Sequence, residues 1–267
     1  SAHDASVDQN IAYGALDAGS GSGAWPYLKL VDANGNPIAN DAVPISRAYR
    51  DTAGNGKLQD WSFNLLNEVD QNWQKLSSKN LMATIGFNYK LRSDLRLQLM
   101  YNYQYNPVEV KDWLGLKSFK MRNLINYLSQ WNDVALLKMP IPVGDRLINA
   151  HTNNINQTGR FQVNYAPQFK DGMHKIDVLG AAEIRERRFE RDVKTLYGYD
   201  PSNLNIIPVD PTTVFPFLNQ KFGGGNIPIA DVLQKTTNRY VSLLANANYS
   251  FLDRYNLSAS IRKDASN

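Results

Sequence analysis

Residues 81–105 alternate between apolar and polar side chains, and this alternation restricts the fold more than any other feature. A period of two is typical of β-strands, because successive side chains of a strand point to opposite faces. The run divides at residues 92–94, a short polar stretch that suits a hairpin turn. One face of the predicted hairpin is apolar and contains Leu81, Ala83, Ile85, Phe87, Tyr89, Leu91, Leu95, Leu97, Leu99, Tyr101, Tyr103 and Tyr105.

The same pattern occurs twice more along the chain. The alternation predicts strand hairpins over residues 79–106, 157–188 and 239–264. The remaining stretches are rich in glycine, proline and asparagine, so we expect long loops at 1–78, 107–156 and 189–238. Short helical turns are expected at 62–70, and the spacing of apolar residues predicts a short helix at 119–130. The sequence therefore predicts an all-β fold, an antiparallel up-and-down meander of about six long strands.

Strands with one apolar and one polar face have two common settings. They pack on a second sheet in a soluble sandwich, or they face lipid in an outer-membrane barrel. An arm of about 11 residues, tilted near 45°, covers roughly 25 Å, which matches the apolar band of such a barrel. Short turns alternating with long loops are also typical of these barrels. Known membrane barrels start at about eight strands, so the piece would belong to a larger barrel.

Composition excludes several other classes of protein. No stretch approaches 18 consecutive apolar residues, so no transmembrane helix is expected, and the first ten residues lack the apolar region of a signal peptide. The absence of cysteine excludes disulfides and thiolate chemistry. The net charge of +4 comes from scattered basic residues among 25 acidic ones, which argues against nucleic-acid binding.

Neither a metal site nor an active site is expected. His3, His151 and His174 are far apart in the sequence and lack ligand spacing. Carboxylates such as Asp60 and Glu68 have no sequence context that would give one the role of acid and the other the role of base. We therefore expect no enzyme activity, no cofactor and no metal. The mixed charge run at 183–192 is interpreted as a solvated strand end with mutual pairing.

Aromatic residues of the predicted loops are the candidate ligand contacts. Exposed aromatic side chains stack on sugar faces or contact a partner protein, although loop packing alone also accounts for such residues. All five tryptophans lie outside the predicted strands. The ligand-binding candidates are Trp25, Trp61, Trp113, Trp131, Tyr197 and Tyr199.

The polar face of the predicted hairpins supplies a second set of candidates. In a barrel, this face would line the lumen. The predicted lumen-facing residues are Arg96, Gln98, Asn102, Arg160, Gln162, Asn164, Asp177, Glu183, Arg185, Asn246, Asn248 and Arg262.

The last 14 residues, Arg-Tyr-Asn-Leu-Ser-Ala-Ser-Ile-Arg-Lys-Asp-Ala-Ser-Asn, resemble a barrel strand of SusC/RagA-type TonB-dependent transporters. In that family, such a strand commonly reads Tyr-x-Leu-x-Ala-Ser-x-Arg-x-Asp-(Gly/Ala)-Ser. Further stretches that resemble the family are residues 30–37, 49–50, 58–61, 180–185 and 197–200.

The resemblance implies a location in the cell outer membrane of Bacteroidota-type bacteria and a role in importing glycans or peptides. It implies a barrel of about 22 strands, with extracellular loops, a SusD-like surface lipoprotein as partner, and contact with the TonB complex through a plug domain. By this resemblance, the 267 residues are a fragment of the barrel without the plug. A soluble β-sandwich that binds carbohydrate through loop tryptophans is the alternative.

Overall fold

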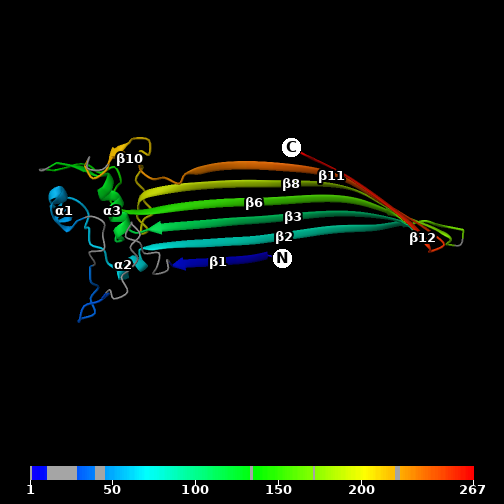
Figure 1. Cartoon of the computed structure of the whole chain (residues 1–267), viewed down its shortest axis with the longest axis horizontal. Coiled ribbons are helices and arrows are strands. Elements are labelled where there is room, and N and C mark those ends of the chain that lie inside the picture. The colour runs from blue at the N-terminus through cyan, green and yellow to red at the C-terminus, as the bar shows by residue number, and fades with distance from the viewer. Residues whose placement is uncertain (1, 11–28, 40–45, 133–134, 171, 220–222) are drawn as a thin grey trace.

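One large antiparallel sheet dominates the protein. The computed structural model describes residues 2–10, 29–39, 46–132, 135–170, 172–219 and 223–267. The strand order is β1-β2-β3-β6-β8-β11-β12 (Figure 1), and β7 pairs with the first two residues of β8. The strands are β1 Ala2–Asn10, β2 Asn72–Arg92, β3 Leu95–Leu114, β6 Asp145–Tyr165, β7 Gln168–Phe169, β8 His174–Tyr199, β11 Val232–Phe251 and β12 Tyr255–Ser266. The predicted all-β meander of six long strands is confirmed.

The helices and two small sheets gather at one end of the large sheet, and the short turns lie at the other (Figure 1). The predicted helical segments are confirmed as α2 and α3. No helix in the described ranges is long and apolar enough to cross a membrane. The elements at this end are α1 Arg47–Thr52, η2 Ala53–Gly56, α2 Leu65–Val69, α3 Phe119–Leu128, β4 Gln130–Trp131, β5 Leu136–Lys138, β9 Phe215–Pro216 and β10 Gly224–Gly225.

The register brings the apolar side chains of neighbouring strands level with one another. Leu81 pairs with Tyr105, which pairs in turn with Ile155. This apolar face is bare in the described part of the chain: Ile85 is 71% exposed and Ile261 is 72% exposed. A soluble sandwich would cover such a face with a second sheet.

The apolar residues of this face form a band whose edge crosses the strands obliquely. On the loop side we place the edge of the band at Leu81, Tyr105, Ile155, Ile184, Val241 and Ile261, one on each long strand; the stacked Trp73 and Trp113 lie on the same face beyond this edge.

Following the paired residues from strand to strand, Ile261 of β12 lies at the same level as Leu97 of β3. Leu81 of β2 pairs with Tyr105 of β3, which is eight residues further along that strand than Leu97. Five strand spacings separate β2 from β12. At about 3.3 Å per residue and about 4.8 Å between strands, the edge makes an angle of roughly 45° with the strands.

The strands continue well beyond the apolar band. Five of them contain 20 to 26 residues, against the 11 or so expected for each arm, and the loops are correspondingly shorter than predicted. In β3 the alternation persists but changes phase: Val108 and Val110 lie on the polar face, whereas Glu109 and Lys111 lie on the apolar one. The change of phase looks like the end of a strand in the sequence, which is why the predicted boundaries fall short.

Ion pairs occupy the apolar face just beyond the band. Arg239 Nε lies 2.7 Å from Glu186 Oε2, and Lys235 Nζ lies 2.6 Å from Glu190 Oε1. Arg188 also pairs with Glu186, at 3.0 Å. The expected mutual pairing within the 183–192 run is confirmed, although the run lies inside β8 and not at its end.

Pro107 interrupts the pairing of β2 with β3. The ladder is continuous from β3 to β6 at this position, but between β2 and β3 it skips Lys79 and Asn80. A proline has no N–H to donate, so the gap is expected where its nitrogen faces β2. Pro107 lies in a strand because β3 extends past the predicted boundary at residue 106.

Two further segments differ from the expected loops. Residues 2–10 lie within the stretch predicted as one long loop, yet they form β1 and pair with β2 over their full length. Their polar composition carries no apolar alternation that would have indicated a strand. Gly224–Gly225, which lie in the predicted loop 189–238, pair with Phe215–Pro216, and a Cβ on Gly225 would lie 2.5 Å from the ring of Phe217.

Candidate functional site

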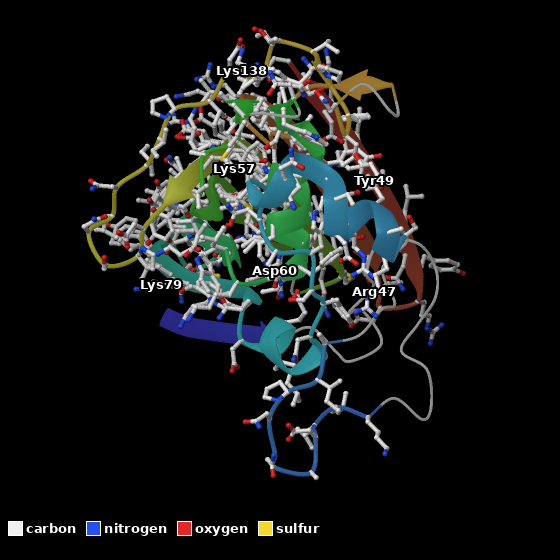
Figure 2. All side chains as sticks on the ribbon, turned by 90° about the vertical axis from the view of Figure 1, so that its left-hand side faces the viewer. Arg47, Tyr49, Lys57, Asp60, Lys79 and Lys138 are labelled. Carbon is white, nitrogen blue, oxygen red and sulfur yellow. The ribbon has the colours of Figure 1, made fainter. Side chains whose placement is uncertain are left out.

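The end of the sheet away from the short turns carries a compact cap. We define the cap as the described residues of 46–71, 115–144 and 200–231, which join β1 to β2, β3 to β6, and β8 to β11. Figure 2 looks onto this end and shows α1 in light blue lying over α3 in green. The apolar core beneath it consists of Leu114, Met121, Ile125, Leu128, Ile141, Tyr197, Phe215 and Ile227.

Helix α3 begins at a well-capped N-terminus. Ser118 is fully buried, and its hydroxyl accepts a hydrogen bond from the N–H of Met121 at 3.1 Å. The carboxylate of Glu68, from α2, accepts the N–H of Phe119 at 2.5 Å. A carboxylate at a helix N-terminus also interacts favourably with the helix dipole. Segment 65–69 therefore holds the first turn of α3 in place.

The next turns of α3 form hydrogen bonds with the stretch 57–62. The Asn126 side chain is fully buried and pairs with both backbone groups of Gln59, each at 2.8 Å. Arg122 donates to the carboxylate of Asp60 at 2.9 Å, to its backbone carbonyl at 2.8 Å and to the carbonyl of Ser62 at 2.8 Å. These bonds join residues more than 55 positions apart, so the first loop is ordered by the second.

The third loop docks on the other side of the same helix. The N–H of Leu218 donates to the carbonyl of Tyr127 at 2.8 Å, and the rings of Tyr127 and Phe217 lie 4.8 Å apart. Gln130 donates to the carbonyl of Pro216 at 2.8 Å. Helix α3, in the second cap segment, thus contacts both of the others, and a movement of either one requires these bonds to break.

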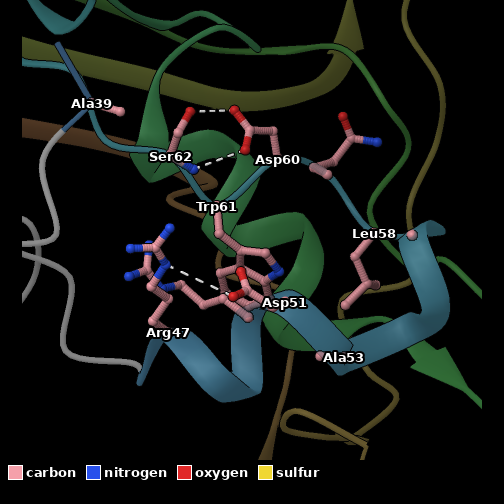
Figure 3. Close-up of a pocket in the computed structure, with 11 residues that line it drawn as sticks. Ala39, Arg47, Asp51, Ala53, Leu58, Asp60, Trp61 and Ser62 are labelled. Carbon is pink, nitrogen blue, oxygen red and sulfur yellow. Dashed lines mark hydrogen bonds and ion pairs between the residues drawn. The ribbon is translucent and has the colours of Figure 1, made fainter.

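A cavity of about 470 Å³ opens between α1 and the stretch 57–62 (Figure 3). The indole of Trp61 lies in the middle of the wall, with Arg47 and Asp51 on one side and Asp60 and Ser62 on the other. Arg47 Nε lies 3.8 Å from Asp51 Oδ2. The cavity combines guanidinium groups, carboxylates and one aromatic wall, a composition suited to a small polar ligand.

Two carboxyl groups of the cap have shifted pKa values. Burial alone would raise the pKa of Asp60, but hydrogen bonds from Ser62 and the charge of Arg122 hold it below the usual value. Burial raises the pKa of Glu68, and the bond from Phe119 opposes this only in part. Both groups serve the packing of α3, and no three metal-ligating side chains cluster within the described residues.

The ligand-binding candidates among the aromatic residues fall into different environments. Trp61 is 7% exposed and Tyr197 is 1% exposed, with the Tyr197 hydroxyl donating to the carbonyl of Pro228 at 2.6 Å. Trp131 and Tyr199 are half-buried, in β4 and β8. Trp25 lies outside the described residues. Tyr197 belongs to the packed core.

Trp113 differs from its expected place in a loop. It lies in β3 directly opposite Trp73 of β2, and the two rings stack 5.6 Å apart. Its indole N–H donates to the carboxylate of Asp145 at 3.0 Å. Trp73 and Trp113 are strand residues because β2 and β3 extend past the apolar band, which the sequence pattern did not indicate.

The predicted lumen-facing residues share one face of the sheet, as their register shows. Arg96 pairs with Asn164, and Gln98 pairs with Gln162. Hydrogen bonds run along the strands, from Arg160 to Gln162 at 2.8 Å and from Gln162 to Asn164 at 3.0 Å. The other predicted members of this face are Asn102, Asp177, Glu183, Arg185, Asn246, Asn248 and Arg262. That this face lines a lumen stays a prediction.

Sequence reasoning missed Arg47, Asp51 and Arg122. Each is an ordinary charged residue of a loop or short helix in the sequence, and only the fold brings them to the cavity or to Asp60. The stretch 58–61 was singled out by family resemblance alone, without any signal of a pocket. The sequence offers Asp60 and Glu68 as a carboxylate pair without a frame for acid and base roles; in the structure both contact α3 and not one another.

Comparison with known proteins supplies a likeness in fold. No protein-family model and no curated protein matches the sequence. Among solved structures, the fold is similar to the RagAB peptide transporter, with a TM-score of 0.55 and 12% identity over 89% of this chain. It is also similar to the RagAB peptide importer in the open-open state, with a TM-score of 0.50 and 12% identity over 74% of this chain. The chain spans 21% and 18% of the lengths of those chains, respectively.

Proposed function

We propose that this chain is a segment of the transmembrane β-barrel of an outer-membrane nutrient importer of the SusC/RagA type. The observation that carries the proposal is the bare apolar band whose edge crosses the strands at roughly 45°, since outer-membrane strands tilt by about 35–45°. A band that is level in the membrane must run obliquely across tilted strands. The fold likeness to the RagAB structures supports the same assignment.

In this proposal the two faces have different roles. The apolar face contacts lipid, and the amide- and arginine-rich polar face lines the lumen. The ion pairs beyond the band lie outside the hydrocarbon, where charged groups are tolerated. The cap then stands on the extracellular side, because long loops of such barrels lie outside the cell.

The partners follow from the family resemblance. We propose a SusD-like surface lipoprotein over the cap, and a TonB complex that acts through a plug domain contributed by the remainder of the protein. The imported material is a glycan or peptide oligomer. The RagAB structures are described as peptide importers, which favours testing peptides first. The half-buried aromatic residues Trp131 and Tyr199 remain candidate contacts.

A soluble sandwich that binds carbohydrate is disfavoured by the exposure of the apolar face. Phe87 is 63% exposed and Leu257 is 71% exposed, and a large bare apolar surface of this kind is rare in soluble monomers.

Cell fractionation tests the proposal. An antibody against this chain should detect a band far above 30.1 kDa in the outer-membrane fraction of the source organism. Deleting the gene should then reduce the uptake of labelled oligopeptides or oligosaccharides. A band near 30.1 kDa in the soluble fraction would contradict the proposal.

A further inference from the structure

The charged run at 183–192 divides its signs unequally between the two faces of β8, an interior strand of the large sheet (Figure 1). Successive side chains of a strand point to opposite faces, so residues two apart share a face. The face of the apolar band carries three of the four acidic residues of the run, Glu186, Glu190 and Asp192. The polar face carries three of its four arginines, Arg185, Arg187 and Arg191.

Two of these arginines have no acidic partner. The carboxylate of Glu183 lies 2.9 Å from Arg185 and compensates that charge. Within the described part of the chain, no carboxylate lies within ion-pair distance of Arg187 or Arg191, and both side chains are exposed. Their neighbours on β6 and β11 are all neutral: Asn156 and Asn238 pair with Arg187, and Thr152 and Gln234 pair with Arg191. The polar face therefore holds an uncompensated positive charge at this level of β8.

Phe189 lies between the two arginines on the same face. It is half-buried and pairs with Asn154 of β6 and Thr236 of β11. An aromatic ring offers contact area to an apolar side chain, and the surrounding amides can donate to and accept from peptide groups. We name Arg187, Phe189 and Arg191 the arginine patch.

The spacing of the arginine patch matches that of an extended peptide. Arg187 and Arg191 are four residues apart on a strand, a distance of roughly 13 Å at about 3.3 Å per residue. A bound peptide in the same extended conformation would place acidic side chains at positions i and i+4 opposite the two guanidinium groups. The side chain at position i+2 would then lie opposite Phe189.

We propose that the arginine patch binds oligopeptide cargo that carries acidic residues. Guanidinium groups form charge-assisted hydrogen bonds with carboxylates, and their planar geometry suits a bidentate contact. Positive charge along the wall of a lumen also raises the local concentration of anionic solutes. The inference rests on the proposed function, because the polar face meets the cargo only if it lines the lumen, and it deepens that function by naming the class of peptide.

Calorimetric titration of the purified full-length protein tests the inference with three blocked peptides. The first is acetyl-Ser-Glu-Ser-Leu-Ser-Glu-Ser-amide, and the other two have glutamine or lysine in place of both glutamates. The glutamate peptide should bind at least about tenfold more tightly than the glutamine peptide, and the lysine peptide should bind most weakly. Added salt should reduce this preference, because it screens exposed charges. Equal affinities for the glutamate and glutamine peptides, or no binding of the glutamate peptide, would overturn the inference.

Matched variants of adjacent residues locate the binding. Arg187→Gln and Arg191→Gln should each weaken binding of the glutamate peptide several-fold or more, and Arg187→Lys should weaken it less because the charge remains. Arg188→Gln is the control: it removes the same charge from the same strand but on the opposite face, where Glu186 keeps Arg239 at 2.7 Å. Equal losses in Arg187→Gln and Arg188→Gln would show that only overall charge matters and would contradict a site at the patch.

Cell fractionation separates a failure of this inference from a failure of the proposed function. A protein that is found in the outer membrane and binds all three peptides equally overturns the inference alone. A protein in the soluble fraction contradicts the proposed function itself, whatever its peptide affinities.

Discussion

Asn126 pairs its side-chain amide with both backbone groups of Gln59: Nδ2 donates to the carbonyl oxygen and Oδ1 accepts the N–H, each at 2.8 Å. The arrangement imitates one rung of a β-ladder, with a helical side chain in place of a strand. Because Asn126 is fully buried, neither bond is replaced by water if it is lost. This contact ties the first cap segment to α3.

The variant Asn126→Leu should release the stretch 57–62. Leucine has a similar volume but leaves the N–H and C=O of Gln59 unpaired, which costs about 1–3 kcal/mol. Hydrogen exchange in peptides covering 57–63 should therefore become roughly 10 to 100 times faster. Lys120→Ala, at an exposed position of the same helix, is the control. Unchanged exchange in Asn126→Leu would show that the segment is held by other contacts.

Arg122→Lys should loosen the same stretch although the charge is kept. The guanidinium of Arg122 reaches the backbone carbonyls of Asp60, Ser62 and Ser118 and the Asp60 carboxylate, and a single ammonium cannot match this geometry. Limited proteolysis of the folded protein should cleave within 46–62 several times faster in the variant. Equal cleavage rates would indicate that charge alone is sufficient.

Glu68 should make the first turn of α3 sensitive to pH. Because burial raises the pKa of Glu68 above its unfolded value, the ionised carboxylate destabilises the folded contact. The contact is therefore most stable below the unfolded pKa and weakens as the pH rises through the raised folded pKa. Exchange of the amides at 118–121, corrected for the intrinsic rate, should report this change.

Glu68→Gln separates the charge from the hydrogen bond. Glutamine still accepts the N–H of Phe119 but does not titrate, so the pH dependence should vanish while the turn stays protected. Glu68→Ala removes the acceptor and should speed exchange at every pH. A pH dependence that survives in Glu68→Gln would assign the effect to another group.

Pro107→Val should strengthen the sheet. A valine restores an N–H at the position where the β2–β3 ladder skips Lys79 and Asn80, and one new backbone bond contributes about 0.5–1.5 kcal/mol. Exchange in the peptide covering residues 79–81 should slow accordingly. Faster exchange would mean that the proline nitrogen does not face β2.

The sequence predicts the parts of this fold that repeat a simple pattern. The alternation from Leu81 to Tyr105 predicts the first hairpin, and the spacing of Met121, Leu124, Ile125 and Leu128 predicts α3. Prediction stops at Asn106, because beyond it Val108 and Val110 lie on the opposite face of β3 from Tyr105 and the pattern resembles a strand end.

The candidate site is much less predictable than the sheet. The Asp60–Arg122 pair joins residues 62 positions apart, and nothing near either residue indicates the other. Tyr197 resembles an exposed loop aromatic in the sequence, but the extension of β8 carries it into the core. Loop residues lack a periodic signal, so their contacts emerge only from the packing of α3 against the other two cap segments.

The membrane assignment of the apolar face can be measured directly by nitroxide accessibility. The 267 residues contain no cysteine, so single cysteines can be placed at chosen positions of this chain within the full-length protein and spin-labelled. Labels at Ile85 and Phe87 should collide with lipid-soluble oxygen, whereas labels at Thr84, Asn88 and Lys79 should collide with a water-soluble nickel complex. On β12 the change from oxygen to nickel accessibility should fall between Ile261 and Lys263, as the oblique edge requires. Labels at Ile85 and Phe87 that are shielded from both reagents, or as open to nickel as the label at Lys79, would contradict a lipid-facing band.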